Sequence, residues 1–367
     1  MSSSNSVDIQ FGAEIEVLCY PRQRYASWEV FALRLRDSLT NPKLGPQKLR
    51  CHISTVVDKT AKRYKEWSIV EEETIAATKD TYAVELVTPV FKFSERDWHQ
   101  ELSTAWSQLK GFGPVAENPH CSTHVHLSPK PSPARPNGTW ELSDVQKIAK
   151  AVLYFERAVD AVMPARRWLN PYCQSNRHND AAAALPQKLP GEKLAAYIEN
   201  INGAGTIVQV VNMINAVGPP PTGGAWTRSK VFRWNFCPLI EGGPSTIEFR
   251  QPPGSDNETH TRLWINFAVA FVQMALFCEP PSGWNLRIVA DPKLLATMME
   301  QGAKKADMLP GDITYLTTWI RNHKQLPEVQ GTTKQLQAAG QAGMTFLKKK
   351  AGMNKVDVQQ FKNFYLV

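Results

Sequence analysis

Three pairs of ionisable residues, each pair separated by a single apolar residue, occur at distant points of the chain. They are Glu14 with Glu16, His124 with His126, and Glu248 with Arg250. Each pair lies in a short segment where apolar and polar residues alternate, a pattern typical of a β-strand. Side chains two residues apart on a strand point to the same face. Each pair should therefore share one face, and Glu85 lies in a fourth segment of the same kind.

Carboxylates and imidazoles with no cysteine close by in the sequence are suitable ligands for a hard cation such as Mg²⁺ or Mn²⁺. Several converging acids would repel one another unless cations neutralised them. Arg250 adds positive charge, and metal ions with arginine are the groups that bind and transfer phosphoryl groups. Zinc is the weaker expectation because the chain has no HExxH motif, and no GxxxxGK[ST] phosphate loop is present. The residues leave open that these are solvated outer faces of strands.

The composition is that of a folded, soluble protein. The chain has 367 residues, 43% of them hydrophobic, and a net charge of +8 that favours anionic partners. Its longest basic run is Lys348 to Lys350, so no nucleic-acid partner is expected. Six cysteines without a CxxC pair indicate reduced thiols. No secretory leader and no membrane-spanning stretch is apparent, so we expect a cytoplasmic protein with no membrane partner.

Alternating segments predict strands at 10–18, 81–89, 122–128 and 245–251. Apolar spacing predicts helices that position them: one begins at Ser143 with a capping box and ends before Pro164, and one follows Ser94. A third, around 261–277, is apolar on nearly all sides and should be buried. Beyond residue 290, segments at 294–299, 313–320 and 333–361 have helical spacing but no residues that indicate chemistry.

A series of motifs resembles the amidoligase family, relatives of glutamine synthetase and glutamate-cysteine ligases. In chain order they are FGAEIEV (11–17), WSIVEEETI (67–75), YAVELVTPV (82–90), ENPHCSTHVHLSP (117–129), MPARRWLNPYCQ (163–174), FRWNFCPL (232–239) and TIEFRQPPGS (246–255). The resemblance covers about residues 8 to 275. It implies an α+β fold with a largely antiparallel, curved sheet of the glutamine synthetase type, whose polar concave face is the active site and whose other face is covered by helices.

The resemblance also implies ATP-dependent formation of an amide bond between a carboxylic acid and an amine, with two or three Mg²⁺ or Mn²⁺ ions. The implied metal ligands are Glu14, Glu16, Glu85, His124 and Glu248. His126, Arg250, Arg233 and Asn235 are expected to bind the nucleotide, with Arg250 and Arg233 also catalytic. Asn118, Arg166, Arg167 and Asn170 are expected to bind substrate. Residues 1–290 would form the catalytic domain, and 291–367 a helical extension packed on the core.

One departure from the family pattern concerns the amine. Relatives tend to have W-x-x-x-x-D-x-S, whereas this chain has Glu72 at the aspartate position. Glu72 is our candidate for the base that deprotonates the amine, with Glu73 as the alternative. The same residues leave two other functions open: a metal-dependent amide hydrolase that activates water, and a nucleotide-binding relative without catalysis. We expect amino-acid-like substrates and a monomer or small homo-oligomer.

Overall fold

A computed structural model describes residues 6–41, 48–54, 64–75, 77–78, 80–116, 120–168, 170–183, 185, 190–217, 228–240, 244–281, 283–284 and 290–323. The chain divides into two compact units, which we describe separately. The strand unit consists of Asp8–Lys130 and Pro252–Ala268, and the helical unit of Met1–Val7, Pro131–Gln251 and Val269–Val367. Helix α8 (Glu258–Phe277) contributes residues to both.

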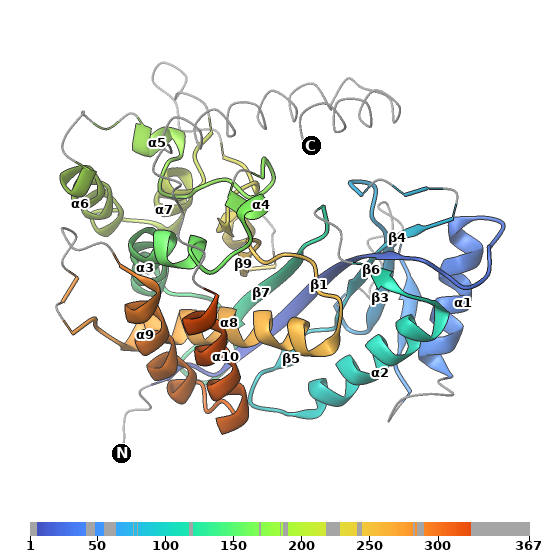
Figure 1. The fold of residues 1–367 in the computed structure, drawn as a ribbon. Coiled ribbons are helices and arrows are strands. Elements are labelled where there is room, and N and C mark those ends of the chain that lie inside the picture. The colour runs from blue at the N-terminus through green and yellow to red at the C-terminus, as the bar shows by residue number, and fades with distance from the viewer. Residues whose placement is uncertain are drawn as a thin grey trace. The chain divides into compact units, whose positions relative to one another are not determined.

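The strand unit contains most of the described β-structure (Figure 1). Its elements are β1 (Ile9–Cys19), α1 (Trp28–Thr40), β2 (Cys51–Ile53), β3 (Trp67–Glu71), β4 (Tyr82–Val87), β5 (Phe91–Lys92), α2 (Asp97–Phe112), β6 (Val115–Ala116) and β7 (Thr123–Pro129). The strand order is β2-β3-β4-β1-β7, while β5 and β6 also pair with β1. Only β2 and β3 run parallel among the described pairs of this unit, so the sheet is mixed and mostly antiparallel.

The two helices of the strand unit pack on one face of the central strands. Odd-numbered residues of β1 are apolar and buried, from Ile9 to Cys19. Phe11 contacts Trp98 of α2, with ring centroids 5.1 Å apart. On the same face, Phe31 of α1 stacks on Tyr82 of β4 at 4.5 Å. Burial of these large rings supplies much of the unit's hydrophobic stabilisation, and it leaves the even-numbered residues of β1 on the opposite face.

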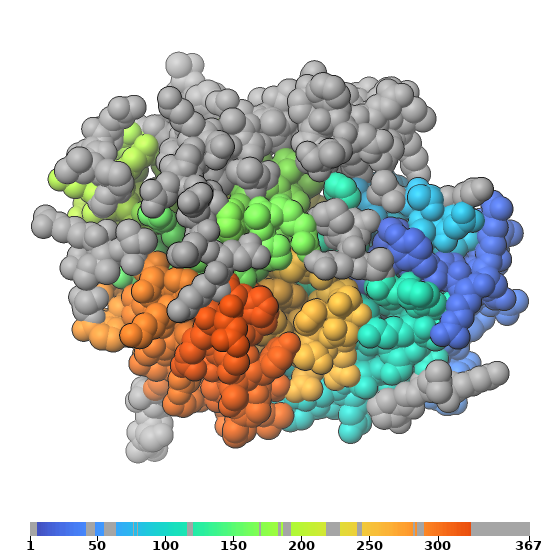
Figure 2. Space-filling view, in the orientation of Figure 1, coloured from blue at the N-terminus to red at the C-terminus, as the bar shows by residue number. Residues whose placement is uncertain are grey.

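The helical unit contains a two-strand hairpin among helices. Its elements are α3 (Leu142–Asp160), α4 (Ala165–Trp168), α5 (Asp180–Ala183), α6 (Pro190–Asn202), α7 (Ile207–Ile214), β8 (Trp234–Asn235), the 3₁₀-helix η1 (Cys237–Leu239), β9 (Ile247–Phe249), α9 (Pro292–Lys305) and α10 (Pro310–Asn322). Strands β8 and β9 are antiparallel, with Trp234 opposite Phe249. Atoms of α10 reach the surface (Figure 2). Tyr315 is among the exposed large hydrophobic residues of this helix.

The core of the helical unit forms around the second half of α8. Trp234 stacks on Phe249 with ring centroids 4.4 Å apart and lies 4.9 Å from Phe271 of α8. Helix α9 approaches α8 closely at Gly302, where an added Cβ would lie 2.1 Å from the carbonyl oxygen of Ala270. A side chain at position 302 would therefore push the two helices apart.

The predicted α+β class, with a mostly antiparallel sheet, is confirmed. The buried helix predicted at 261–277 is also confirmed as α8. The helix predicted from Ser143 begins one residue earlier, at Leu142, and the predicted capping box of Ser143 and Gln146 is wrong. Glu141 and Asp144 form the box instead, and the Asp144 carboxylate accepts from the backbone N–H of Glu141 at 3.2 Å. The curvature of the sheet and the domain boundary at residue 290 stay predictions. The helix predicted at 333–361 lies outside the described residues.

Candidate active site

The register of three strands gathers the predicted polar residues of the strand unit. On β1 and β7, Glu14 lies opposite His124, and Gly12 lies opposite His126. On β1 and β4, Glu16 lies opposite Glu85. Directly opposed residues of antiparallel strands have Cβ atoms about 5 Å apart on the same face. The structure thus brings five predicted residues of this unit onto one face.

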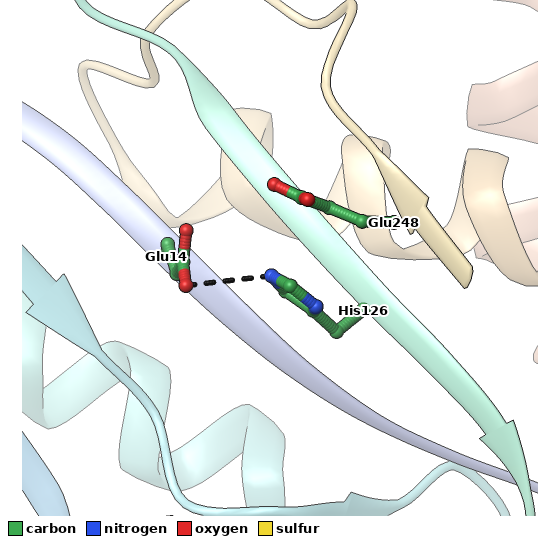
Figure 3. A group of neighbouring side chains, drawn as sticks. All are labelled: Glu14, His126 and Glu248. Carbon is green, nitrogen blue, oxygen red and sulfur yellow. Dashed lines mark ion pairs between the residues drawn. The ribbon is translucent and has the colours of Figure 1, made fainter. Parts of the chain in front are cut away.

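Four of these side chains form a cluster, which we call the carboxylate–imidazole cluster: Glu14, Glu16, His124 and His126. The Glu14 Oε2 atom lies 3.2 Å from Nδ1 of His124. The other oxygen of Glu14 lies 3.3 Å from Nε2 of His126 (Figure 3). His124 also faces Glu16, with Nε2 and Oε1 3.8 Å apart. One carboxylate therefore contacts both histidines, and one histidine contacts both carboxylates.

Glu16 is held in place by the start of β7. Its side chain is buried, and its Oε2 atom accepts from the backbone N–H of Ser122 at 2.8 Å and from the Ser122 hydroxyl at 2.7 Å. A buried carboxylate is costly unless its oxygens are hydrogen-bonded. These two donors leave the second oxygen, Oε1, directed at His124.

The pKa values of two carboxyl groups, those of Glu14 and Glu72, are shifted in opposite directions. Burial raises the pKa of Glu14, but the charge of His126 and hydrogen bonds with both histidines outweigh burial and hold the pKa well below its usual range. Burial and the negative charge of Glu16 raise the pKa of Glu72, although its Oε1 accepts from the Thr74 N–H at 2.6 Å. The pKa values of Glu14 and Glu72 are thus shifted in opposite directions, as those of acid–base sites often are.

The donor atoms of the cluster suit a divalent cation. Two ligand atoms that each lie about 2.1 Å from one ion, at right angles, are about 3 Å apart. The 3.2 Å between Glu14 Oε2 and His124 Nδ1 is close to that separation. The carboxylate oxygens of the cluster suit Mg²⁺ or Mn²⁺.

In the helical unit, Glu248 is buried and both of its carboxylate oxygens have partners. Asn235 on β8 donates its side-chain N–H to Oε2 of Glu248 at 2.6 Å. Arg250 forms an ion pair with Oε1. Glu248 therefore contacts both Asn235, its cross-strand partner, and Arg250, which follows β9 by one residue.

Arg233 is fully buried in the helical unit. Its NH1 atom lies 2.9 Å from Oε1 of Glu156 and 3.2 Å from Oδ2 of Asp160, both on α3. Burial raises the pKa of Asp160 to about 7, the charge of Arg233 opposes that rise, and the charge of Glu156 adds to it. The guanidinium of Arg233 is thus occupied by an acidic pair inside the protein.

The predicted substrate-binding residues occupy different environments. Arg167 is buried and donates Nε–H to the Gln251 carbonyl at 2.9 Å and an NH2 hydrogen to the Arg250 carbonyl at 2.8 Å. Arg166 is exposed. Asn170 accepts from the Tyr172 N–H at 2.8 Å, and Asn118 lies outside the described residues.

Several residues that hold the site residues in position were not predicted: Ser122, Glu156, Asp160, Asn176 and Asn215. Glu156 and Asp160 had a usable signal, because acids four residues apart on a helix lie together and these interrupt the mostly apolar second half of α3. The sequence held no such signal for Asn176 and Asn215, because their partners are backbone groups distant in sequence.

All six cysteines are free thiols, as predicted. Burial raises the pKa of the Cys173 thiol, which makes it a poor nucleophile. None of the described helices combines the length and the apolar character that crossing a membrane requires.

The strand unit thus presents carboxylates and imidazoles on a mostly antiparallel sheet of an α+β protein, in an arrangement suited to a divalent cation. The model of a family described as putative amidoligase enzymes matches residues 8–272. The chain belongs to this family, as the order of its motifs predicts.

The chain is similar to the crystal structure of a bifunctional glutathione synthetase from Pasteurella multocida, with 12% sequence identity and a TM-score of 0.31. The similarity covers 98% of this chain and 51% of that one, so this chain spans about half the length of that structure. No curated protein sequence matches the chain.

Proposed function

We propose that this protein is an ATP-dependent ligase that joins a carboxylic acid to an amine. The observation that carries the proposal is the carboxylate–imidazole cluster on β1 and β7 in a member of the amidoligase family. A carboxylate does not react with an amine by itself, because it would have to expel oxide or hydroxide. Transfer of the γ-phosphoryl group of ATP to the acid gives an acyl phosphate and ADP. Attack of the amine then forms the amide and releases phosphate and a proton.

The proposed metal ligands are Glu14, Glu16, Glu85, His124 and Glu248, for two or three Mg²⁺ or Mn²⁺ ions. Bound cations would neutralise the phosphate oxygens of ATP and stabilise the charge that develops during phosphoryl transfer. The Ser122 hydrogen bonds support the role of Glu16, since they orient its carboxylate before any ion binds. His126 is proposed to lie beside the nucleotide phosphates.

Direct contact with phosphate is proposed for Arg250 rather than Arg233. The Arg250 side chain is 11% exposed, whereas that of Arg233 is 0% exposed and paired with two acids. Burial therefore supports an indirect role for Arg233 and Asn235, and exposure supports substrate binding by Arg166. Asn118, Asn170 and Arg167 stay as candidates for substrate contacts.

Glu72 is the proposed base for the attacking amine. It follows β3, is partly buried, and accepts from the Thr74 N–H at 2.6 Å, which limits the freedom of its carboxyl. A base must be held within hydrogen-bond reach of the proton that it removes. The proposed amines and acids are amino-acid-like.

The experiment that tests this function is ADP release from Mg²⁺-ATP, with pooled carboxylic acids, in the presence and absence of pooled amines. Products are weighed by mass spectrometry. We expect ADP release that needs both pools, and a product lighter than its parents by one water. Glu14→Gln should abolish release, while Glu95→Gln, a control in the same unit at an exposed carboxylate, should not.

Two results would contradict the proposal. Amide cleavage when ATP is withheld would identify a metal-dependent hydrolase. Tight binding of the magnesium nucleotide, with no phosphate release in any pool, would indicate a relative that binds nucleotide without catalysis.

A further inference from the structure

Strand β8 is only two residues long, yet it carries a side chain that contacts Glu248. One edge of β8 pairs with β9. The backbone groups on its other edge need partners because they are buried. Within the described residues, that second edge is completed by side chains and not by another strand.

Asn176 pairs with Trp234 as a neighbouring strand would. Its side-chain oxygen accepts from the Trp234 N–H at 2.9 Å, and its side-chain N–H donates to the Trp234 carbonyl at 2.8 Å. The amide of one side chain therefore replaces one peptide group of a strand. The segment just before Asn176 already lies beside the segment just before Trp234, because Gln174 forms a parallel bridge with Phe232.

Asn215 also bonds this edge of the strand, with one contact before Asn235 and one after it. Its side-chain oxygen accepts from the Phe236 N–H at 2.9 Å, and its side-chain N–H donates to the Trp234 carbonyl at 3.1 Å. Both asparagines are 0% exposed. A buried amide is unfavourable unless it is hydrogen-bonded, and here two of them bond the residues immediately before and after Asn235.

Asn235 itself is oriented at both ends of its amide. Its side-chain oxygen accepts from the Cys237 N–H at 2.9 Å, and its side-chain N–H donates to Glu248 at 2.6 Å. The oxygen contact defines which end of the amide faces Glu248. The direction of this donor then depends on the backbone that Asn176 and Asn215 hold.

We propose that Asn176 and Asn215 are positioning residues that fix Asn235, and through it the Glu248 carboxylate, in the geometry that binds a divalent cation. The proposal rests on the proposed function, in which Glu248 is a metal ligand. Partners that orient a metal ligand commonly change affinity 10- to 100-fold when removed. Asn176 and Asn215 act one step further away, through the backbone.

The test is Mn²⁺ binding to the full chain, measured from the free-Mn²⁺ signal by electron paramagnetic resonance at a temperature where circular dichroism shows every variant folded. We expect Asn235→Ala and Asn215→Ala to weaken binding about 10-fold or more. The matched control is Asn179→Ala. Asn179 is also a buried asparagine, with bonds to the Met213 and Ile214 carbonyls at 2.8 and 2.9 Å, but those bonds do not involve β8.

A purely structural role would reduce the free energy of unfolding in both Asn215→Ala and Asn179→Ala and leave the Mn²⁺ affinity unchanged in both. The proposal requires the Mn²⁺ affinity to fall in Asn215→Ala and not in Asn179→Ala. It also requires that Asn215→Ala cause no further loss of Mn²⁺ affinity when Asn235 is already replaced by alanine, because Asn215 acts on Glu248 through Asn235. If Asn215→Ala does not fold, Asn215→Ser replaces it in both comparisons.

The outcomes separate the two proposals. Wild-type protein that binds no Mn²⁺ overturns the proposed metal site and this inference together. Wild-type binding, with Asn215→Ala equal to Asn179→Ala, overturns this inference alone and leaves the proposed function standing.

Discussion

Glu14 and His124 are cross-strand partners on β1 and β7, and a carboxylate oxygen of the first lies 3.2 Å from Nδ1 of the second. This relationship joins two motifs that are 110 residues apart in the chain. Because His126 reaches the other oxygen of Glu14, the carboxylate bridges both imidazoles. The cluster is therefore assembled by register, and residues that maintain the register should control it.

Ser122 should stabilise the folded state through Glu16. Removing its hydroxyl in Ser122→Ala deletes a hydrogen bond to a buried carboxylate, which should lower the free energy of unfolding by about 1.5–3 kcal/mol. Ser128→Ala is the control on the same strand, since its hydroxyl accepts from the neutral Gln10 amide at 3.0 Å and should contribute about 1 kcal/mol. Urea unfolding at pH 7 measures both. An equal loss in the two variants would contradict the special role of Ser122.

Gly254 should be required for the approach of the chain to the start of β7. An added Cβ would lie 2.6 Å from the Cβ of Cys121, next to Ser122. Gly254→Ala should therefore lower the free energy of unfolding by about 1–3 kcal/mol. Gly111→Ala in α2 has nothing within 4 Å of its new Cβ and should raise stability by about 0.5–1 kcal/mol. Thermal unfolding measures both variants, and melting temperatures that shift in the same direction would contradict this account.

Arg167 and Arg166 should differ in what their replacement changes. Lysine at 167 cannot donate to two carbonyls in the fixed fork of a guanidinium, so Arg167→Lys should lower the free energy of unfolding by about 2–4 kcal/mol. Arg166→Gln at an exposed position should stay within about 0.5 kcal/mol of the wild type. If Arg166 binds substrate as proposed, its variant should raise KM in the ADP assay. Full stability of Arg167→Lys would refute the assigned contacts.

Asp160 should make the folded state less stable as pH rises. Its pKa of about 7 in the folded protein, raised by burial, exceeds the value near 3.9 expected in the unfolded chain. The folded state therefore binds more protons between about pH 4 and 7, and the stability present below pH 4 is lost across that window. Relative to Asp160→Asn, wild-type unfolding free energy should fall by up to about 1.4 kcal/mol per pH unit. Urea unfolding at pH 5, 6 and 7 measures the difference in unfolding free energy between the wild type and Asp160→Asn. A difference that stays constant would contradict the prediction.

His178 should have the opposite dependence in nearly the same window. Burial lowers its pKa to about 4, although the charge of Glu156 opposes the change. The unfolded chain, with a histidine pKa near 6.5, binds more protons between about pH 4 and 6.5. Stability from neutral His178 is thus present above pH 6.5 and lost as pH falls. The unfolding free energy of the wild type, compared with that of His178→Gln, should rise with pH from 4.5 to 6.5, and a falling difference would rule out a buried neutral His178.

Local patterns in the sequence predicted the elements and the faces of the side chains. A strand repeats every two residues, so Glu14 with Glu16 and His124 with His126 had to share faces wherever those strands lay. Apolar spacing predicted α2, α3 and α8 in the same way, because helix periodicity is a property of neighbouring residues. The order of the motifs was enough to predict the amidoligase family.

Tertiary structure alone decided which of these residues meet. Strand order and register set Glu14 opposite His124 and Glu16 opposite Glu85, and no local pattern specifies a partner distant in the chain. The same holds for Arg233, whose sequence neighbours indicated phosphate binding but whose guanidinium is buried against Glu156 and Asp160. Burial and long-range pairing depend on how the whole chain packs, which is why they could not be predicted from the residues around each motif.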